Sequence, residues 1–266
     1  MGNAIASEFR KFFTTRLWWG MAIGMFVAGA IFAGFFGWAL TTDNPGMGGP
    51  GGAMTGDDVQ IANTVYTAGI GVGYLLLLTI GVLQIGAEYR HKTISGTFLA
   101  TPRRLQAMLA KVVALLGIGA LYGVISLAGS AAVGGTVLSL RGHDPFPSTE
   151  ILRTFALSLL VLGLWGLIGL GVGILIKNQV AALLIGIGVA WIVEPIAGLL
   201  LSFWSWGADH VVKYMPSEAT QAVVNGVTQG REIARLDWWA AALVLAAYAV
   251  LLSGFGIWRT VREDVT

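Results

Sequence analysis

The residues that could carry out chemistry are few, and they are scattered along the chain. There is no cysteine, which excludes disulfide and thiolate chemistry. The three histidines, His91, His143 and His210, are far apart, and neither a His-Glu-x-x-His nor a Gly-x-Ser-x-Gly motif is present. Met47 and Met54 have no neighbouring histidine or cysteine with which to bind copper. We therefore expect no catalytic, cofactor-binding or metal-binding residue, and we predict that the chain is not itself an enzyme.

One carboxylate lies in the middle of a long apolar stretch. Glu194 is followed directly by Pro195. A carboxylate inside a membrane is costly, and it usually faces a partner or a wet cavity. Proline removes a backbone donor and kinks a helix, which suits a gate or a cavity wall. Two interpretations stay open: Glu194 and Pro195 belong to a substrate pathway or gate, or Glu194 makes a structural hydrogen bond to a neighbouring helix.

The elements that would position these residues are transmembrane helices. Hydrophobic residues make up 56% of the 266 residues and charged residues only 11%, whereas a soluble domain carries about 25% charged residues. A helix needs roughly 20 apolar residues to cross the hydrocarbon core. The stretches that are long enough are 17–40, 61–85, 105–140, 151–176, 180–203 and 238–258. We predict an all-α integral membrane protein whose six transmembrane helices form one domain over residues 1–266.

The distribution of charge predicts that both ends of the chain lie in the cytoplasm. If the N-terminus is inside, eleven of the sixteen lysines and arginines fall on cytoplasmic segments and five fall outside. Positive residues are enriched on the cytoplasmic side of membrane proteins. The net charge of +2 is too small to indicate binding to nucleic acid. The predicted location is therefore a cell membrane, crossed several times, with no nucleic-acid partner.

The segment 1–16 has the pattern of an amphipathic helix. An apolar stripe at helical spacing consists of Ile5, Phe9, Phe12 and Phe13. Glu8, Arg10 and Lys11 lie off this stripe. The pattern predicts a helix that lies on the lipids of the inner leaflet before the first span. The alternative is an ordinary solvated leader.

The cytoplasmic loop 86–104 is divided into parts. Thr101 followed by Pro102 is typical of a helix start, with a hydroxyl cap and then proline at the first helical position. Residues 93–100 before it are expected to form a separate short helix, with Ile94, Phe98 and Leu99 on one exposed side. Exposed apolar residues on a short, charged loop indicate a docking site, and the alternative is a plain positively charged loop.

The segment 204–237 is too long for a turn and too polar to span a membrane. Pro216 and Ser217 predict the start of a short helix that ends after Val224. We expect this helix to dip into the outer leaflet before the last span. In the fourth span, Gly169 and Gly173 have the spacing of a close helix–helix contact.

The segment from Glu88 to Lys111 resembles a signature of ABC-2 type permeases, the membrane subunits of bacterial ATP-driven exporters. In that family an acidic residue closes span two, a Thr-Ile or Gly-Thr pair follows, and Pro-x-Arg opens span three. The corresponding residues here are Gly86-Ala87-Glu88, Thr93-Ile94, Gly96-Thr97 and Pro102-Arg103-Arg104. The layout of six spans, a leading amphipathic helix and an outer helix before span six is also similar to that family.

The resemblance implies a role for the loop helix. Residues 93–101 would be the coupling helix, which seats in a groove of a separate ATPase, and the N-terminal helix would contact the same ATPase. The residues expected to contribute to coupling are Glu88, Arg90, Thr93, Ile94, Gly96, Thr97, Phe98, Leu99, Thr101, Pro102 and Arg104. No Gly-x-x-x-x-Gly-Lys-Ser/Thr motif is present, so ATP and magnesium would be bound by two copies of the partner ATPase. A second permease subunit, expected to be another copy of this chain, would complete the transporter.

The resemblance also implies the direction and the kind of cargo. The expected function is export of a hydrophobic or amphipathic substrate, such as a drug, antibiotic, lipid or lipopeptide, across the bacterial inner membrane. Multidrug efflux and antibiotic resistance fall within this expectation. The alternative is an ion-coupled secondary transporter that uses Glu194, although no inverted repeat is visible. A structural or sensor membrane protein would not need the divided loop.

Overall fold

The computed structural model describes residues 1–42, 58–100, 103–224 and 236–262. The regular structure in these ranges is entirely helical. Six helical segments are long and apolar enough to cross a membrane, so the prediction of an all-α protein with six candidate spans is confirmed and the chain is a multi-pass membrane protein.

The spans follow the predicted stretches closely. In chain order they are α2 (Leu17–Leu40), α3 (Asp58–Thr67) with α4 (Ile70–Arg90), α6 (Arg104–Leu140), α7 (Glu150–Leu175), α8 (Gln179–Gly188) with η1 (Val189–Val193) and α9 (Glu194–Leu201), and α12 (Trp238–Arg262). The second span is interrupted between α3 and α4, and the last span continues four residues beyond its predicted end at Trp258.

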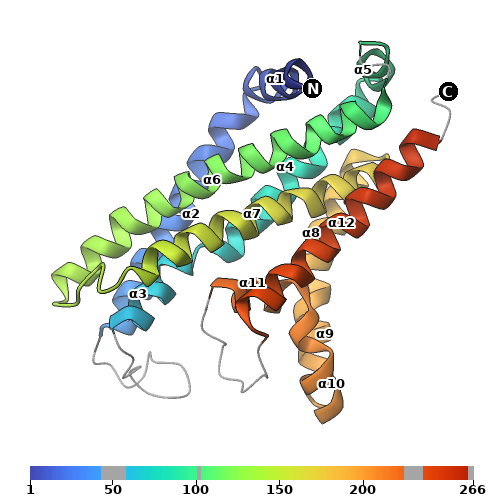
Figure 1. Cartoon of the computed structure of the whole chain (residues 1–266). Helices are drawn as coiled ribbons and strands as arrows, with labels where there is room; N and C mark the ends of the chain where they lie inside the picture. Colours follow the sequence, from blue (N-terminus) through green and yellow to red (C-terminus); the bar gives the residue numbers. More distant parts are fainter. Residues whose placement is uncertain (43–57, 101–102, 225–235, 263–266) are drawn as a thin grey trace.

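Short helices lie at the two ends of the bundle. They are α1 (Gly2–Phe13), α5 (Ile94–Ala100), α10 (Ser205–His210), η2 (Val212–Tyr214) and α11 (Pro216–Val224). Figure 1 shows α1, α5 and the last turns of α12 at the same end of the bundle, and α3, α10 and α11 toward the other. We call the first the α5 end and the second the α11 end. The charge distribution predicts that the α5 end is cytoplasmic.

The fourth span is the centre of the bundle. In α7, 72% of the most apolar stretch is buried, against 22% in the span formed by α8, η1 and α9. Glycines allow α4 to lie directly on α7, because a side chain at Gly81 would collide with Gly166 O and one at Gly169 would collide with Leu78 O. Gly173 likewise faces Val82 on α4. The predicted glycine contact of the fourth span is therefore the contact with α4.

The fifth span changes its helical pitch next to Pro195. The π-helical turn η1 ends at Val193, immediately before Glu194 and Pro195. Proline has no N–H to donate and its ring crowds the preceding turn, and a widened turn is one way for a helix to accommodate such an interruption. The irregularity predicted at Pro195 is therefore a wide turn on its N-terminal side.

The start of α6 differs from the prediction. The helix begins at Arg104, with Arg103 at the N-cap position and no side-chain cap. Arg103 has a non-helical backbone, with ψ of 88°, so the first helical residue follows it. A helix start capped by Thr101 is therefore wrong, and Thr101 and Pro102 themselves lie outside the described residues.

Candidate functional site

Helix α1 presents a charged side chain to the bundle. Glu8 and Phe12, one helical turn apart, are its buried residues, and Phe13 is exposed. Phe12 packs edge-on against Tyr122 of α6, with ring centroids 5.9 Å apart. The predicted apolar stripe is thus only partly the packed face, because Glu8 points inward and Phe13 points outward. The amphipathic helix itself is present over Gly2–Phe13.

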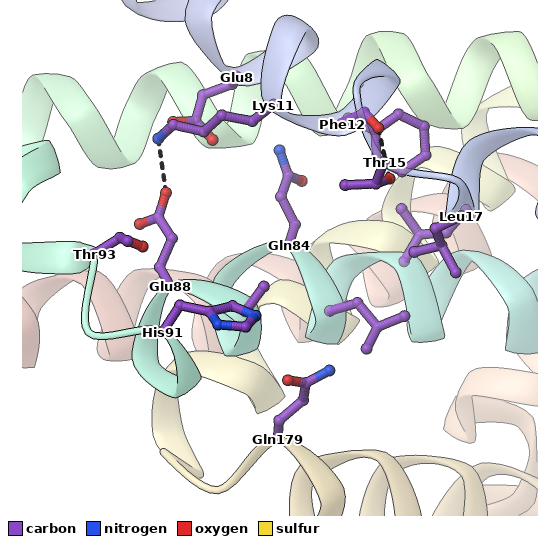
Figure 2. Close-up of a pocket in the computed structure, with 13 residues that line it drawn as sticks. Glu8, Lys11, Phe12, Thr15, Leu17, Gln84, Glu88, His91, Thr93 and Gln179 are labelled. Carbon is purple, nitrogen blue, oxygen red and sulfur yellow. Dashed lines mark hydrogen bonds and ion pairs between the residues drawn. The ribbon is translucent and has the colours of Figure 1, made fainter.

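Glu8 belongs to a group of four charged side chains that we call the charge cluster: Glu8, Lys11, Glu88 and Lys111. Lys111 Nζ lies 2.8 Å from Glu8 Oε2 and 2.6 Å from Glu88 Oε1. Lys11 Nζ lies 2.7 Å from Glu8 Oε1 and 2.7 Å from Glu88 Oε1. Figure 2 shows Glu88 reaching from α4 toward Lys11 of α1. Since Lys11 Nζ also lies 3.4 Å from Thr97 Oγ1, the cluster joins α1, α4, α5 and α6.

The cluster is buried and balanced. The Lys111 side chain is 1% exposed, and both carboxylates are nearly as enclosed. Removing charges from water is expensive, and only close partners with good geometry offset the cost. Two carboxylates facing two ammonium groups meet this requirement, so the four residues depend on one another.

Lys11 is the member of the cluster at the protein surface. Partial burial by itself would lower the pKa of Lys11, but the hydrogen bonds and charges of Glu8 and Glu88 outweigh burial and raise this pKa above the ordinary lysine value of 10.5. While Glu8 and Glu88 are ionised, the pairing contributes its full stability below pH 10.5, and this contribution is lost as the pH rises through the higher folded-state pKa of Lys11. Lys11 is charged at neutral pH.

Helix α5 packs through one face and exposes the other. Ile94 and Phe98, four residues apart, are 6% and 9% exposed, whereas Leu99 is 83% exposed. The prediction that all three residues form one exposed side is wrong, because a spacing of four places Ile94 and Phe98 together and turns Leu99 away from them. The guanidinium of Arg104, at the start of α6, lies 5.5 Å from the centre of the Phe98 ring.

The turn that leads into α5 is closely defined. Lys92 has a left-handed backbone, with φ of 55°. The N–H of Thr93 donates to Glu88 O at 3.0 Å, and that of Lys92 donates to Tyr89 O at 3.3 Å. These two bonds form a Schellman motif that ends α4. The remaining residues predicted for coupling surround it: Arg90 is exposed at the end of α4, and Gly96 faces open space.

Two hollows flank the charge cluster. A groove of about 330 Å³ lies between α1, α5 and α6, and small residues of these helices line part of it: Ala4, Ser7, Gly96, Ala107 and Ala110. A cavity of about 490 Å³ lies on the other side, between α1, the start of α2, α4 and the start of α8.

Glu194 lies apart from these residues, in the span whose far end leads to α10. Its carboxylate is buried and accepts a hydrogen bond from the N–H of Ser217, in the first turn of α11. A second bond to the same helix runs from Trp165 Nε1 of α7 to Thr220 Oγ1, at 2.8 Å. The structure thus contains the structural hydrogen bond that was one of the two interpretations of Glu194.

No local sequence pattern predicts the charge cluster. The pattern of residues 1–16 places Glu8 off the apolar stripe, and Lys111 stands out only as an inner positive charge at the end of the segment that resembles the permease signature. The available signal was a lysine several residues inside an apolar helix, which needs a buried acidic partner.

Neither a scan against protein-family models nor a search of curated proteins returns a match to this chain.

Proposed function

We propose that this chain is the permease subunit of an ABC-2 type exporter, which moves a hydrophobic or amphipathic substrate outward as a separate ATPase hydrolyses ATP. One observation carries the proposal. Helix α5 is attached through buried contacts and the charge cluster to α1, α4 and α6, and it turns Leu99 to the outside.

The exposed side of α5 suits an incoming partner. Leu99 is 83% exposed and offers an apolar contact to a partner. The 330 Å³ groove, which other residues of α5 line, is bounded by α1 and α5 together, so a single partner could touch both helices. We assign Leu99 and this groove as the contact surface for the ATPase.

The charge cluster is suited to transmit movement. A push on α5 reaches Lys11 through Thr97, and Lys11 is bonded to residues of α1 and α4. Lys111 links the same carboxylates to α6. Because separating buried ion pairs is costly, these helix ends are expected to move together rather than slide apart. Such coupled motion would open a path between spans.

The proposed assembly contains more than this chain. The sequence has no ATP-binding motif, so two ATPase copies would supply ATP and magnesium at the α5 end. The first and fifth spans are the least enclosed, with 28% and 22% of their most apolar stretches buried, and their free faces suit lipid or a second copy of the chain. The proposed location is the bacterial inner membrane.

An ion-coupled transporter that uses Glu194 has less support. The carboxylate of Glu194 accepts a hydrogen bond from Ser217 N–H in the first turn of α11. This bond supports a structural role for the residue. We therefore assign Glu194 to holding α11 in place.

The test is purification of the tagged chain from its native membranes in mild detergent, followed by an ATPase assay. We expect an ATPase subunit to copurify. The Leu99→Asp variant should reduce its recovery at least about tenfold, since a charge replaces an apolar contact. Ile94 and Phe98 are unsuitable for this test because they are buried and aspartate there would unfold α5.

Leu140→Asp is the matched control. Leu140 is equally exposed, at 81%, but it ends α6 at the opposite end of the bundle. It should leave ATPase recovery unchanged. Absence of any ATPase from the native preparation, or equal recovery with Leu99→Asp, would contradict the proposal.

A further inference from the structure

The cavity of about 490 Å³ beside the charge cluster has the size of a small-molecule site. Its apolar wall comes from α1, α2 and α4 and consists of Phe12, Leu17, Ile80, Leu83 and Ala87. Exposed residues such as Thr15 and His91 lie at its rim. The cavity can therefore hold an apolar chain while remaining accessible from outside.

Three residues that line this mostly apolar cavity carry buried polar atoms without a hydrogen-bond partner within the part of the chain that the structure describes. These atoms are Oε1 and Nε2 of Gln84, Oε2 of Glu88 and Oε1 of Gln179. Figure 2 shows Gln84 projecting from α4 toward α1, and Gln179 projecting from the start of α8 toward α4. Buried polar atoms are normally paired, so this grouping offers three acceptors and one donor to a bound molecule.

The charge of the bound group follows from the charge cluster. The Glu88 side chain is 7% exposed, and its other oxygen is already shared by Lys11 and Lys111. With two carboxylates and two ammonium groups the cluster is neutral, so an added ammonium would bring a buried charge without compensation. An anionic head would face the free oxygen of Glu88 and would be repelled. An uncharged head that donates hydrogen bonds fits both limits.

We propose that this cavity binds an amphiphile with an apolar chain and an uncharged, hydroxyl- or amide-bearing head. The chain lies against Leu83 and the other apolar wall residues. The head donates to Glu88 Oε2, Gln84 Oε1 and Gln179 Oε1, and accepts from Gln84 Nε2. The inference rests on the proposed function only in treating this molecule as a cargo; the binding itself requires no ATPase.

The test uses photolabelling of the purified chain alone in phosphatidylcholine nanodiscs. Three probes carry the same twelve-carbon chain with a diazirine, and their heads are glycerol, a primary amine and a carboxylate. Labelled residues are mapped by mass spectrometry. We expect the alkylglycerol to label the wall of the cavity, and the two charged probes to label it at least about fivefold less at equal concentration.

Two variants test the polar contacts. Gln84→Leu and Gln179→Leu should each lower cavity labelling by the alkylglycerol roughly fivefold, as expected for loss of neutral hydrogen bonds. Neither should harm folding, because an apolar side chain replaces a buried polar group. Gln221→Leu, on α11 at the other end of the bundle, should leave labelling unchanged.

Competition identifies the source of the ligand. If diacylglycerol included in the disc competes, the ligand is a resident membrane lipid; if only the single-chain alkylglycerol competes, it is a free amphiphile. Either result supports the site. Equal labelling by all three probes, labelling unaffected by the glutamine variants, or no label at the cavity wall would overturn the proposal. A labelled cavity in a chain that copurifies with no ATPase would retain the site and reject the proposed function.

Discussion

The two ends of the bundle hold their surface helices by different physical means. At the α5 end, α1 and α5 are attached through the charge cluster, in which each lysine contacts both carboxylates. At the α11 end, α11 is held by separate bonds: Glu194 accepts from a backbone N–H, and Trp165 donates to Thr220. Only one of these two bonds involves an ionisable side chain.

The difference predicts different responses to force and to mutation. In the cluster, losing the buried Lys111 leaves buried carboxylates without full compensation, so the buried members act as a unit. At the α11 end, one neutral hydrogen bond can be lost without affecting the other, since each contributes about 1 kcal/mol independently. The α5 end is therefore suited to move as one body, and the α11 end to rearrange in parts.

Lys111→Met should cause the largest loss of stability among the variants that test this comparison. Methionine retains an unbranched apolar side chain but leaves Glu8 and Glu88 buried with only Lys11 as a cluster cation. Breaking a buried ion pair in this way costs about 3–5 kcal/mol. We expect the unfolding temperature in nanodiscs to fall by on the order of 10 °C. Intrinsic tryptophan fluorescence would measure this unfolding.

Lys11→Met is the matched control for that variant. The Lys11 side chain is 44% exposed, so solvent screens its charges and its loss should cost under about 1 kcal/mol. Adding Glu8→Gln to Lys111→Met should restore part of the lost stability by removing an unpaired charge. Equal losses for the two lysine variants would show that burial does not govern the cluster.

Glu194→Leu should have a smaller effect, confined to the α11 end. It removes the acceptor for Ser217 N–H and should cost about 1–2 kcal/mol, as loss of a helix cap does. Glu194→Gln keeps an acceptor oxygen and should stay close to the parent. Faster hydrogen exchange in α11, with α5 unchanged, would be the expected signature. If Glu194→Gln were as harmful as Glu194→Leu, the charge itself would be needed.

The same contrast explains what could be predicted from the sequence. Span positions follow from long apolar runs, and the start of α11 at Pro216 follows from proline at a first helical position. Both features can therefore be predicted from the sequence. The cluster cannot, because Lys111 and Glu8 are 103 residues apart and no local pattern pairs them. The orientation of Leu99 could have been found, since helical spacing separates it from Ile94 and Phe98.

The ends of α4 and α6 could not be fully predicted from the sequence either. Both close with a Schellman motif, but only α6 has the usual glycine, at Gly142 with φ of 83°. In α4 the left-handed position is Lys92. A lysine is common near the end of a helix, but it does not signal a left-handed cap as glycine does. Tertiary contacts of α5 hold this turn where sequence preference does not.

Substitutions at the left-handed residues of these two helix ends should change stability least, and they compare the two ends directly. Lys92→Gly relieves a left-handed conformation that costs an L-residue about 1–2 kcal/mol, offset by glycine's greater freedom in the unfolded chain, and should stabilise the protein by under about 1 kcal/mol. Gly142→Ala should destabilise it by about 1 kcal/mol, purely through the backbone, because a Cβ there would meet open space. Hydrogen exchange at the amides of Thr93 and His143, which close the two motifs, reports each change locally. Slower exchange at Thr93 in Lys92→Gly would show that the left-handed backbone of Lys92 strains the turn that leads into α5. Faster exchange would show instead that the Lys92 side chain holds α5 in place.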